Sequence, residues 1–309
     1  MDRCRPFRPR RGLVPRHTAS RFAPAAIATL MLVFGWTEGA VAAKEGAAFG
    51  VNNFSGSGEC GSADLRWSDE FIDGLLDALD DHGWDSTERW MNSAVDGRDW
   101  TDSSLEVWGA DENDPYAVDH ADVGMISSHG AHVHSSAGYY SYFVMGDDNT
   151  SEDCRPNSTD QMLFGNTSAG DLEVLILAAC QTAHHDVWTD GGYFHVRERD
   201  GSLSTWLGFH GDSYDSRSDA NRMEDYAQTS FYNGLGDNWI DEMYRNPIGW
   251  NNTQCPTAVV FCEDGRDCDR QFDYGGFDDR FKVALSDVKR ISTYYYISGC
   301  NPSNGGTLP

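Results

Sequence analysis

Lysine is scarce in this chain, and positive charge is scarce with it. Only three Lys occur in 309 residues, and 23 Lys and Arg together stand against 49 Asp and Glu, which gives a formal net charge of −26. Nucleic acids and anionic membranes attract proteins that present positive surfaces. We therefore expect neither as a partner. The acidic surface favours solubility, with adaptation to high salt as the alternative.

Long apolar runs are also missing. The apolar run at residues 23–36 is shorter than the roughly 20 residues that a membrane-spanning helix needs. It follows a leader with seven Arg and precedes the small residues Ala40, Ala42 and Ala43, the order typical of a signal peptide. We predict that residues 1–42 are a signal peptide and that the mature protein is secreted, extracellular or periplasmic, without remaining membrane contact.

The rest of the chain, residues 43–309, contains no linker-like tract and is long enough for one α/β domain. We predict a single domain with a Cys-rich portion at 255–300. Exported proteins use cysteine for disulfides, and six cysteines lie in polar loops or near the chain end: Cys60, Cys154, Cys255, Cys262, Cys268 and Cys300. Their pairing stays open. Cys180 instead ends an apolar run, so we expect it to be the free thiol.

Short apolar runs alternate with helical periodicity along this domain. Strands are expected at residues 47–54, 122–127, 172–179, 204–208, 257–261 and 290–297, with another at 88–94 or 105–108, and helices at 67–84 and within 219–244. The runs at 122–127 and 172–179 are apolar without alternation, which is typical of strands buried in a parallel sheet. The pattern predicts an α/β fold with a mainly parallel central sheet flanked by helices.

Reactive residues follow the two clearest strands. His129 and Gly130 come after residues 122–127, and Cys180 comes after residues 172–179. The carboxyl ends of parallel strands share one edge of a sheet, where functional groups gather. An imidazole beside a thiol lowers the thiol pKa and can protonate a leaving group, so we expect His129 as general acid and base and Cys180 as nucleophile. The backbone amides of Gly130 and Cys180 are expected to stabilise an oxyanion.

These residues resemble the clan of cysteine peptidases that includes caspases, gingipains, separase and CHAT-domain proteases. Members carry His-Gly after one central strand and Ala-Cys after the next, with His about 50 residues before Cys, and the separation here is 51. The run from Val174 to Ala183 is similar to the CHAT pattern, although Gln181-Thr182 stands where a full caspase signature has Gly shortly after the Cys. The resemblance implies a caspase-like three-layer sandwich and an exported cysteine endopeptidase that acts on peptides or proteins without a cofactor.

Two other functions stay open. A metal-dependent hydrolase is one, because His129, His132 and His134 are residue types that bind zinc. A non-catalytic extracellular binding module on the same fold is the other, suggested by the aromatic residues within 139–143. The histidines 132 and 134 are expected on a loop.

Acidic residues near the predicted dyad bear on specificity. Asp147, Asp148 and Asp212 are expected to line a pocket that prefers basic substrates, an expectation that rests on charge alone. The aspartates within 264–273 lack the order of a calcium-binding loop, and we expect a solvated acidic loop there.

Overall fold

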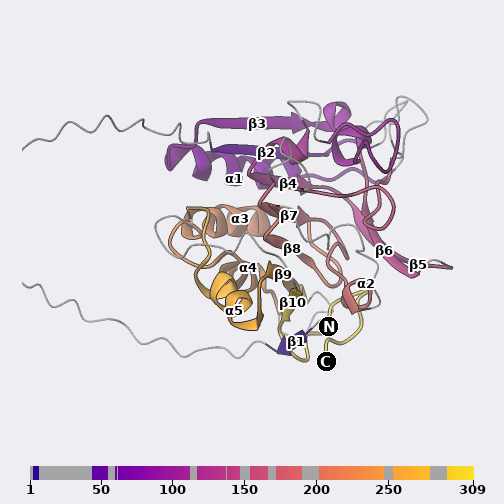
Figure 1. The fold of residues 1–309 in the computed structure, drawn as a ribbon. Coiled ribbons are helices and arrows are strands. Elements are labelled where there is room, and N and C mark those ends of the chain that lie inside the picture. The colour runs from indigo at the N-terminus through magenta and orange to yellow at the C-terminus, as the bar shows by residue number, and fades with distance from the viewer. Residues whose placement is uncertain are drawn as a thin grey trace, which may run out of the picture.

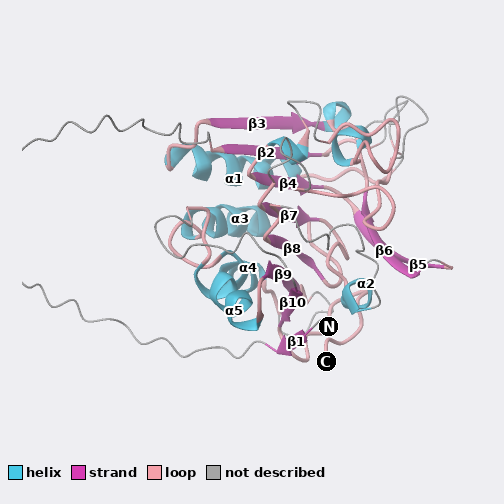
Figure 2. Cartoon of the chain, viewed as in Figure 1, coloured by secondary structure: helices cyan, strands magenta, loops and turns pink. Residues whose placement is uncertain are grey.

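A single large sheet organises the chain (Figures 1 and 2). The structure is a computed structural model that describes residues 3–6, 44–54, 60, 62–111, 117–136, 138–146, 154–165, 172–189, 202–246, 253–278 and 291–309. The strands of the sheet are β1 (Arg3–Pro6), β2 (Glu45–Gly50), β3 (Ser86–Met91), β4 (Val123–Ser127), β7 (Val174–Ala178), β8 (Thr205–Phe209), β9 (Pro256–Cys262) and β10 (Ile291–Tyr296). Their order across the sheet is β1-β10-β9-β8-β7-β4-β2-β3.

The sheet is mainly parallel, as predicted. Only β9 runs against its two neighbours, β8 and β10, whereas the other neighbouring pairs are parallel. Every residue of β4, β7, β8 and β9 is buried. Continuous burial explains why these strands are apolar without alternation, because both of their faces lie in the core.

Four helices cover one face of the sheet: α1 (Ser68–Asp81), α3 (Arg217–Thr229), α4 (Leu235–Met243) and α5 (Gly265–Tyr274). In α1, Phe71, Leu75 and Leu79 recur at helical spacing and are buried toward the strands, which stabilises the helix by removing apolar surface from water. The helix ends before Gly83, whose φ of 73° is left-handed and suits glycine.

Shorter elements cover the other face within the described ranges: the helix α2 (His185–Thr189), the 3₁₀ helices η1 (Asn92–Ala94), η2 (Gly97–Trp100) and η3 (Val118–His120), and a separate hairpin of β5 (Gly130–Ser135) and β6 (Gly138–Phe143). Trp100, Phe143 and Trp188 fill the core on this side. The α/β prediction is confirmed, but long helices lie on only one face of the described part.

Several elements differ from the sequence-based predictions. The strand after α1 is β3, close to the predicted 88–94, whereas residues 105–108 form turns. The expected acidic loop is the helix α5, because the Asp264 carboxylate accepts hydrogen bonds from the backbone amides of Arg266 and Asp267 (2.7 and 3.0 Å) and caps the helix. The loop expected at His132 and His134 is strand β5.

The cysteines pair as Cys60–Cys154, Cys255–Cys300 and Cys262–Cys268. The six predicted disulfide cysteines are therefore confirmed, and Cys180 is the free thiol among the cysteines whose side chains the structure describes. Cys262 and Cys268 do not lie in polar loops, however, since they belong to β9 and α5 and are fully buried.

Most of the predicted signal peptide lies outside the described residues, and it stays a prediction. Its described part is β1, which pairs with β10 at one edge, so cleavage would leave a seven-stranded sheet. Within the described ranges, no helix combines the length and the apolar character that crossing a membrane requires.

Candidate functional site

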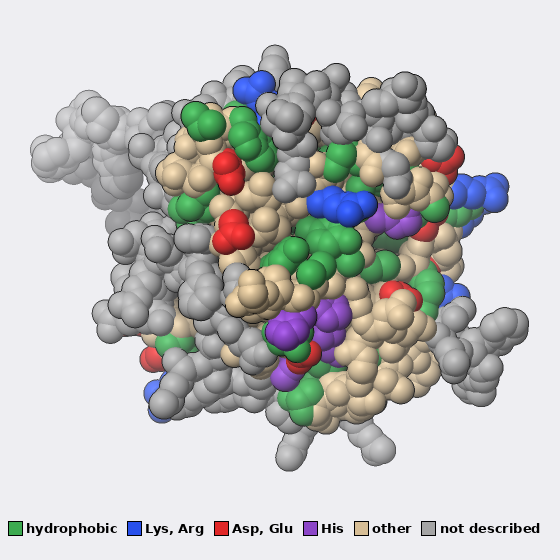
Figure 3. All heavy atoms as spheres, turned by 90° about the vertical axis from the view of Figure 1, so that its right-hand side faces the viewer, with side chains coloured by type: hydrophobic (Ala, Val, Ile, Leu, Met, Phe, Trp, Pro, Cys, Tyr) green, Lys and Arg blue, Asp and Glu red, His purple; other side chains and the backbone are tan. Residues whose placement is uncertain are grey.

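The two predicted catalytic side chains lie at the same edge of the sheet. β4 and β7 are adjacent and parallel, and their last residues, Ser127 and Ala178, are register partners. His129 and Cys180 each follow two residues later, and both line one cavity of about 300 Å³. Figure 3 looks onto the edge toward which these strands point and shows histidine side chains gathered near its middle. The strand-end placement therefore agrees with the sequence-based prediction.

The His129 ring has a fixed partner. Its Nε2 lies 2.7 Å from the backbone oxygen of Ala63, and its ring packs against Phe54 with 5.1 Å between centroids. A carbonyl oxygen can only accept, so the neutral ring carries its proton on Nε2 and leaves Nδ1 as the base. The Cys60–Cys154 disulfide anchors the chain three residues before Ala63. Sequence reasoning missed Ala63, because a backbone carbonyl has no sequence signature.

The Cys180 thiol is held by the backbone of Ser213, whose N–H donates to Sγ (3.3 Å) and whose carbonyl oxygen lies 3.6 Å from Sγ. Burial raises the thiol pKa to about 11. The Ser213 hydrogen bond opposes this rise, and the negative charge of Asp212 adds a smaller contribution to it. The resting thiol is therefore neutral at pH 7. This is the opposite of the lowering that we expected from a neighbouring imidazole.

The turn that follows Cys180 is strongly constrained. Gln181 has a φ of 57°, an uncommon value for a residue other than glycine. Four hydrogen bonds hold it: its N–H donates to Gly211 O (2.9 Å), its carbonyl accepts from Ser141 Oγ (2.8 Å), its Oε1 accepts from His132 N (3.2 Å), and its Nε2 donates to Asn304 O. Such unfavourable backbone persists where surrounding contacts fix it, and it clusters at functional sites.

Gly130 packs directly against the Cys180 turn. A Cβ atom at this position would lie 2.5 Å from the carbonyl oxygen of Cys180, so only glycine fits. The Val144 amide donates to His129 O (2.9 Å), which makes this a hydrogen-bonded pair of the hairpin. Because such pairs alternate, Gly130 and Phe143 form a non-hydrogen-bonded pair, and the Gly130 N–H points away from β6. The predicted oxyanion donor is thus beside the thiol turn and unused by the hairpin.

Of the three predicted specificity residues, Asp212 lines the cavity. Both of its carboxylate oxygens lie 3.0 Å from Asn304 Nδ2, which donates to them. Asp147 and Asp148 lie outside the described residues. One acidic wall of the cavity is therefore built jointly by the loop after β8 and by the C-terminal segment.

The structure does not bring together the three histidines of the alternative metal site. His129 contacts the Ala63 carbonyl, His132 stacks on His184 with 3.7 Å between ring centroids, and His134 stacks on Tyr139 at 4.3 Å. In the described part of the chain, no three or more His, Cys, Asp or Glu side chains converge as a metal site.

A stack of histidines lies behind the thiol turn. His184 sits between His132 and His210, with ring centroids 3.7 and 4.4 Å away. Burial, and then the neighbouring imidazoles, lower the pKa of His184 to about 4 and that of His210 to about 3. Sequence reasoning missed His210, although it directly follows β8 and the strand-end rule applied to this strand would have found it.

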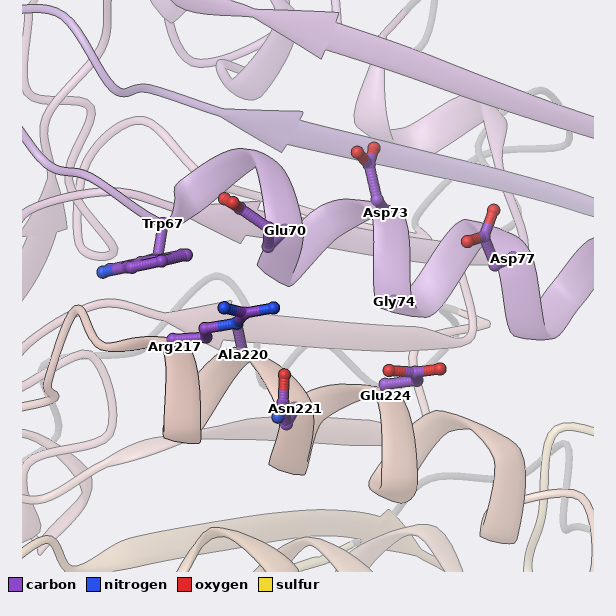
Figure 4. Close-up of a pocket in the computed structure, with 9 residues that line it drawn as sticks. All are labelled: Trp67, Glu70, Asp73, Gly74, Asp77, Arg217, Ala220, Asn221 and Glu224. Atoms are coloured by element: carbon purple, nitrogen blue, oxygen red, sulfur yellow. The ribbon is translucent and has the colours of Figure 1, made fainter.

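A second cavity, of about 420 Å³, lies between α1 and α3 (Figure 4). Four of the nine residues that line it are acidic, and Arg217 lies over the Trp67 ring at 6.0 Å. The residues that line it are Trp67, Glu70, Asp73, Gly74, Asp77, Arg217, Ala220, Asn221 and Glu224. Its lining contains neither a thiol nor an imidazole.

Comparison with known proteins gives a family but no characterised relative. No curated protein and no solved structure matches the chain. Residues 48–259 match the model of a family described as "Domain of unknown function (DUF6345)". The matched span runs from β2 into β9 and contains both His129 and Cys180. Because the match covers more than half of the chain, the protein belongs to the DUF6345 family.

Proposed function

We propose that this chain is an exported cysteine peptidase that hydrolyses peptide bonds through His129 and Cys180. The observation that carries the proposal is the shared cavity, in which the two side chains follow adjacent parallel strands and Gly130 packs against the Cys180 backbone. Three disulfides support export, because such bonds persist in oxidising compartments. A caspase-like sandwich is part of the same proposal.

The arrangement assigns one role to each group. Nδ1 of His129 takes the thiol proton as Sγ of Cys180 attacks the carbonyl carbon of the scissile bond. The N–H groups of Gly130 and Cys180 stabilise the oxyanion that forms. The imidazolium then gives the proton to the leaving amine, and a water activated by the same ring hydrolyses the thioester.

The raised thiol pKa shapes this mechanism. With a pKa of about 11, Cys180 holds its proton at pH 7 before a substrate binds. Proton transfer to His129 therefore accompanies attack on the substrate, as it does for a serine nucleophile. The Ala63 carbonyl supports this step, because it orients the imidazole and stabilises its positive form.

A non-catalytic binding module on the same fold is the second candidate function. One observation favours it: the thiol is buried and neutral, which is typical of an inert structural cysteine. The two functions differ in whether Cys180 attacks the carbonyl carbon of a bound peptide.

A peptide screen tests the peptidase proposal. Purified protein is incubated with internally quenched peptides that vary in the residue before the cleaved bond. We expect cleavage after Arg or Lys, because Asp212 lines the cavity, and we expect a thiol-directed inhibitor to stop it while a metal chelator does not. No cleavage of any peptide, or cleavage that only the chelator stops, would contradict the proposal.

A further inference from the structure

The backbone joins the thiol and an acidic group on one wall of the cavity. Ser213 holds Sγ of Cys180 with its N–H, and the preceding residue is Asp212. The N–H of Asp212 donates to Ser303 O (3.0 Å), and its carboxylate accepts from Asn304. The C-terminal segment therefore fixes the position of this carboxylate relative to the thiol.

The charge of Asp212 has no cationic partner among the described cavity residues. The titratable side chains that line the cavity besides Cys180 are His129, Asp212, Tyr214 and Asp215, and neither Lys nor Arg belongs to its described lining. The Asp215 carboxylate is occupied by the backbone amides of Arg66 and Trp67 (2.5 and 2.8 Å). Among the described residues, the Asp212 carboxylate accepts from the neutral side-chain amide of Asn304, so it is the better partner for an incoming cation.

We propose that Asp212 couples recognition to reactivity, so that Cys180 becomes a reactive nucleophile when an alkylguanidinium or alkylammonium group, such as the side chain of Arg or Lys, enters the cavity and pairs with Asp212. The inference rests on the proposed function for its substrate class. The pairing offsets the negative charge of Asp212, and the loss of that repulsion favours the thiolate. Recognition and activation then occur in one step, and the thiol stays protonated until the cation binds.

The electrostatics of the cavity agree with this coupling. The charge of Asp212 is one of the causes, after burial, of the raised thiol pKa. An ion pair with an incoming cation offsets this contribution. A shift of one unit in the thiol pKa changes the thiolate fraction about tenfold at a pH well below that pKa.

The alkylation rate of Cys180 tests this inference directly. The protein is treated with iodoacetamide at several pH values between 7 and 9, and the adduct is located by peptide mapping. Sγ forms a bond to the methylene carbon, iodide leaves, and the thiol proton passes to the buffer. We expect millimolar methylguanidine to accelerate the reaction about tenfold, whereas methylurea, a neutral molecule of the same shape, leaves the rate unchanged.

Variants test whether the acceleration of Cys180 alkylation depends on the Asp212 carboxylate. Asp212→Asn is expected to react about tenfold faster than the wild type without any ligand, and to gain nothing from methylguanidine. Asp160→Asn, the same change at an exposed site outside the cavity lining, should behave like the wild type. The inference is overturned if methylguanidine slows the wild-type reaction or leaves it unchanged, or if Asp212→Asn keeps the acceleration. Because the assay needs no hydrolysis, acceleration in a protein that cleaves no peptide would overturn the proposed function and leave this inference standing.

Discussion

Replacing Cys180 with alanine is expected to reduce kcat for peptide hydrolysis about 1,000-fold or more, because the substitution removes the nucleophile on which the proposed mechanism depends. His129→Ala should cause a loss of the same order. The double variant should be no worse than either single one, since residues that act as a unit show non-additive effects. Steady-state kinetics on the best peptide from the screen measure all three variants.

Two controls separate a catalytic loss from a structural one. Cys180→Ala removes a single atom from a half-buried residue, so its free energy of unfolding should stay within about 1 kcal/mol of the wild type. His134→Ala removes an exposed imidazole that stacks on Tyr139, and it should retain activity. If Cys180→Ala kept its activity, the thiol would have no role in the chemistry.

Acidification is expected to destabilise the fold through the histidine stack, by about 2 kcal/mol for each of His184 and His210 between pH 7 and pH 5. Their pKa values of about 4 and 3 lie below the ordinary 6.5, so the unfolded chain binds protons first as the pH falls. This stability is complete above about pH 6.5 and is lost progressively toward pH 4 and pH 3. The side chains that face the pair are His132, His185 and Asp186. The Asp186 carboxylate and the backbone carbonyls of Gly305 and Gly306 favour protonation, but burial and the neighbouring imidazoles outweigh them.

Urea unfolding at pH 7 and pH 5 measures this effect. The numerous carboxylates also titrate, so the test compares the wild type with a His184→Gln/His210→Gln variant. Glutamine can still donate a hydrogen bond to the Gly305 carbonyl that His184 faces, but it cannot take a proton in this range. The variant should lose about 4 kcal/mol less than the wild type between the two pH values. His134→Gln, at an exposed position, should keep the wild-type slope; an equal slope in the double variant would show that the stack does not govern acid sensitivity.

The strand ends were the most predictable part of the site. β4 and β7 are short strands in which every residue is buried. Because both faces of such a strand lie in the core, its residues are apolar at consecutive positions, and this pattern is visible in the sequence. Residues that directly follow such runs must emerge at one edge when the strands are parallel neighbours. This reasoning was sufficient to place His129, Gly130 and Cys180 at one edge of the sheet.

Two elements whose sequences lack a long apolar run escaped prediction. β5 is half-buried along nearly its whole length, and its short alternation of Ala131 and Val133 with His132 and His134 was interpreted as a histidine-bearing loop. In α5 the buried residues are mostly polar or cysteine, and the acidic residues that cap it resemble a loop. The signal that could have revealed α5 is Asp264, an N-cap residue followed three positions later by Asp267.

Side-chain contacts between residues far apart in the sequence are beyond sequence reasoning. The His129 ring meets a carbonyl 66 residues away, and Asp212 meets an amide 92 residues away. The protonation state of Cys180 was also beyond sequence reasoning, because it depends on packing. The expected histidine neighbour suggested a lowered thiol pKa, but burial and the Asp212 charge raise it.

The most direct test of the central claim is covalent trapping with a peptidyl acyloxymethyl ketone that carries Arg at the position before the reactive carbonyl. Intact-mass measurement should show one adduct per chain, peptide mapping should place it on Cys180, and His129→Ala should form it at least about 100-fold more slowly. Absence of an adduct on Cys180, or equal rates in the wild type and in His129→Ala, would contradict the proposed dyad and favour a non-catalytic binding module.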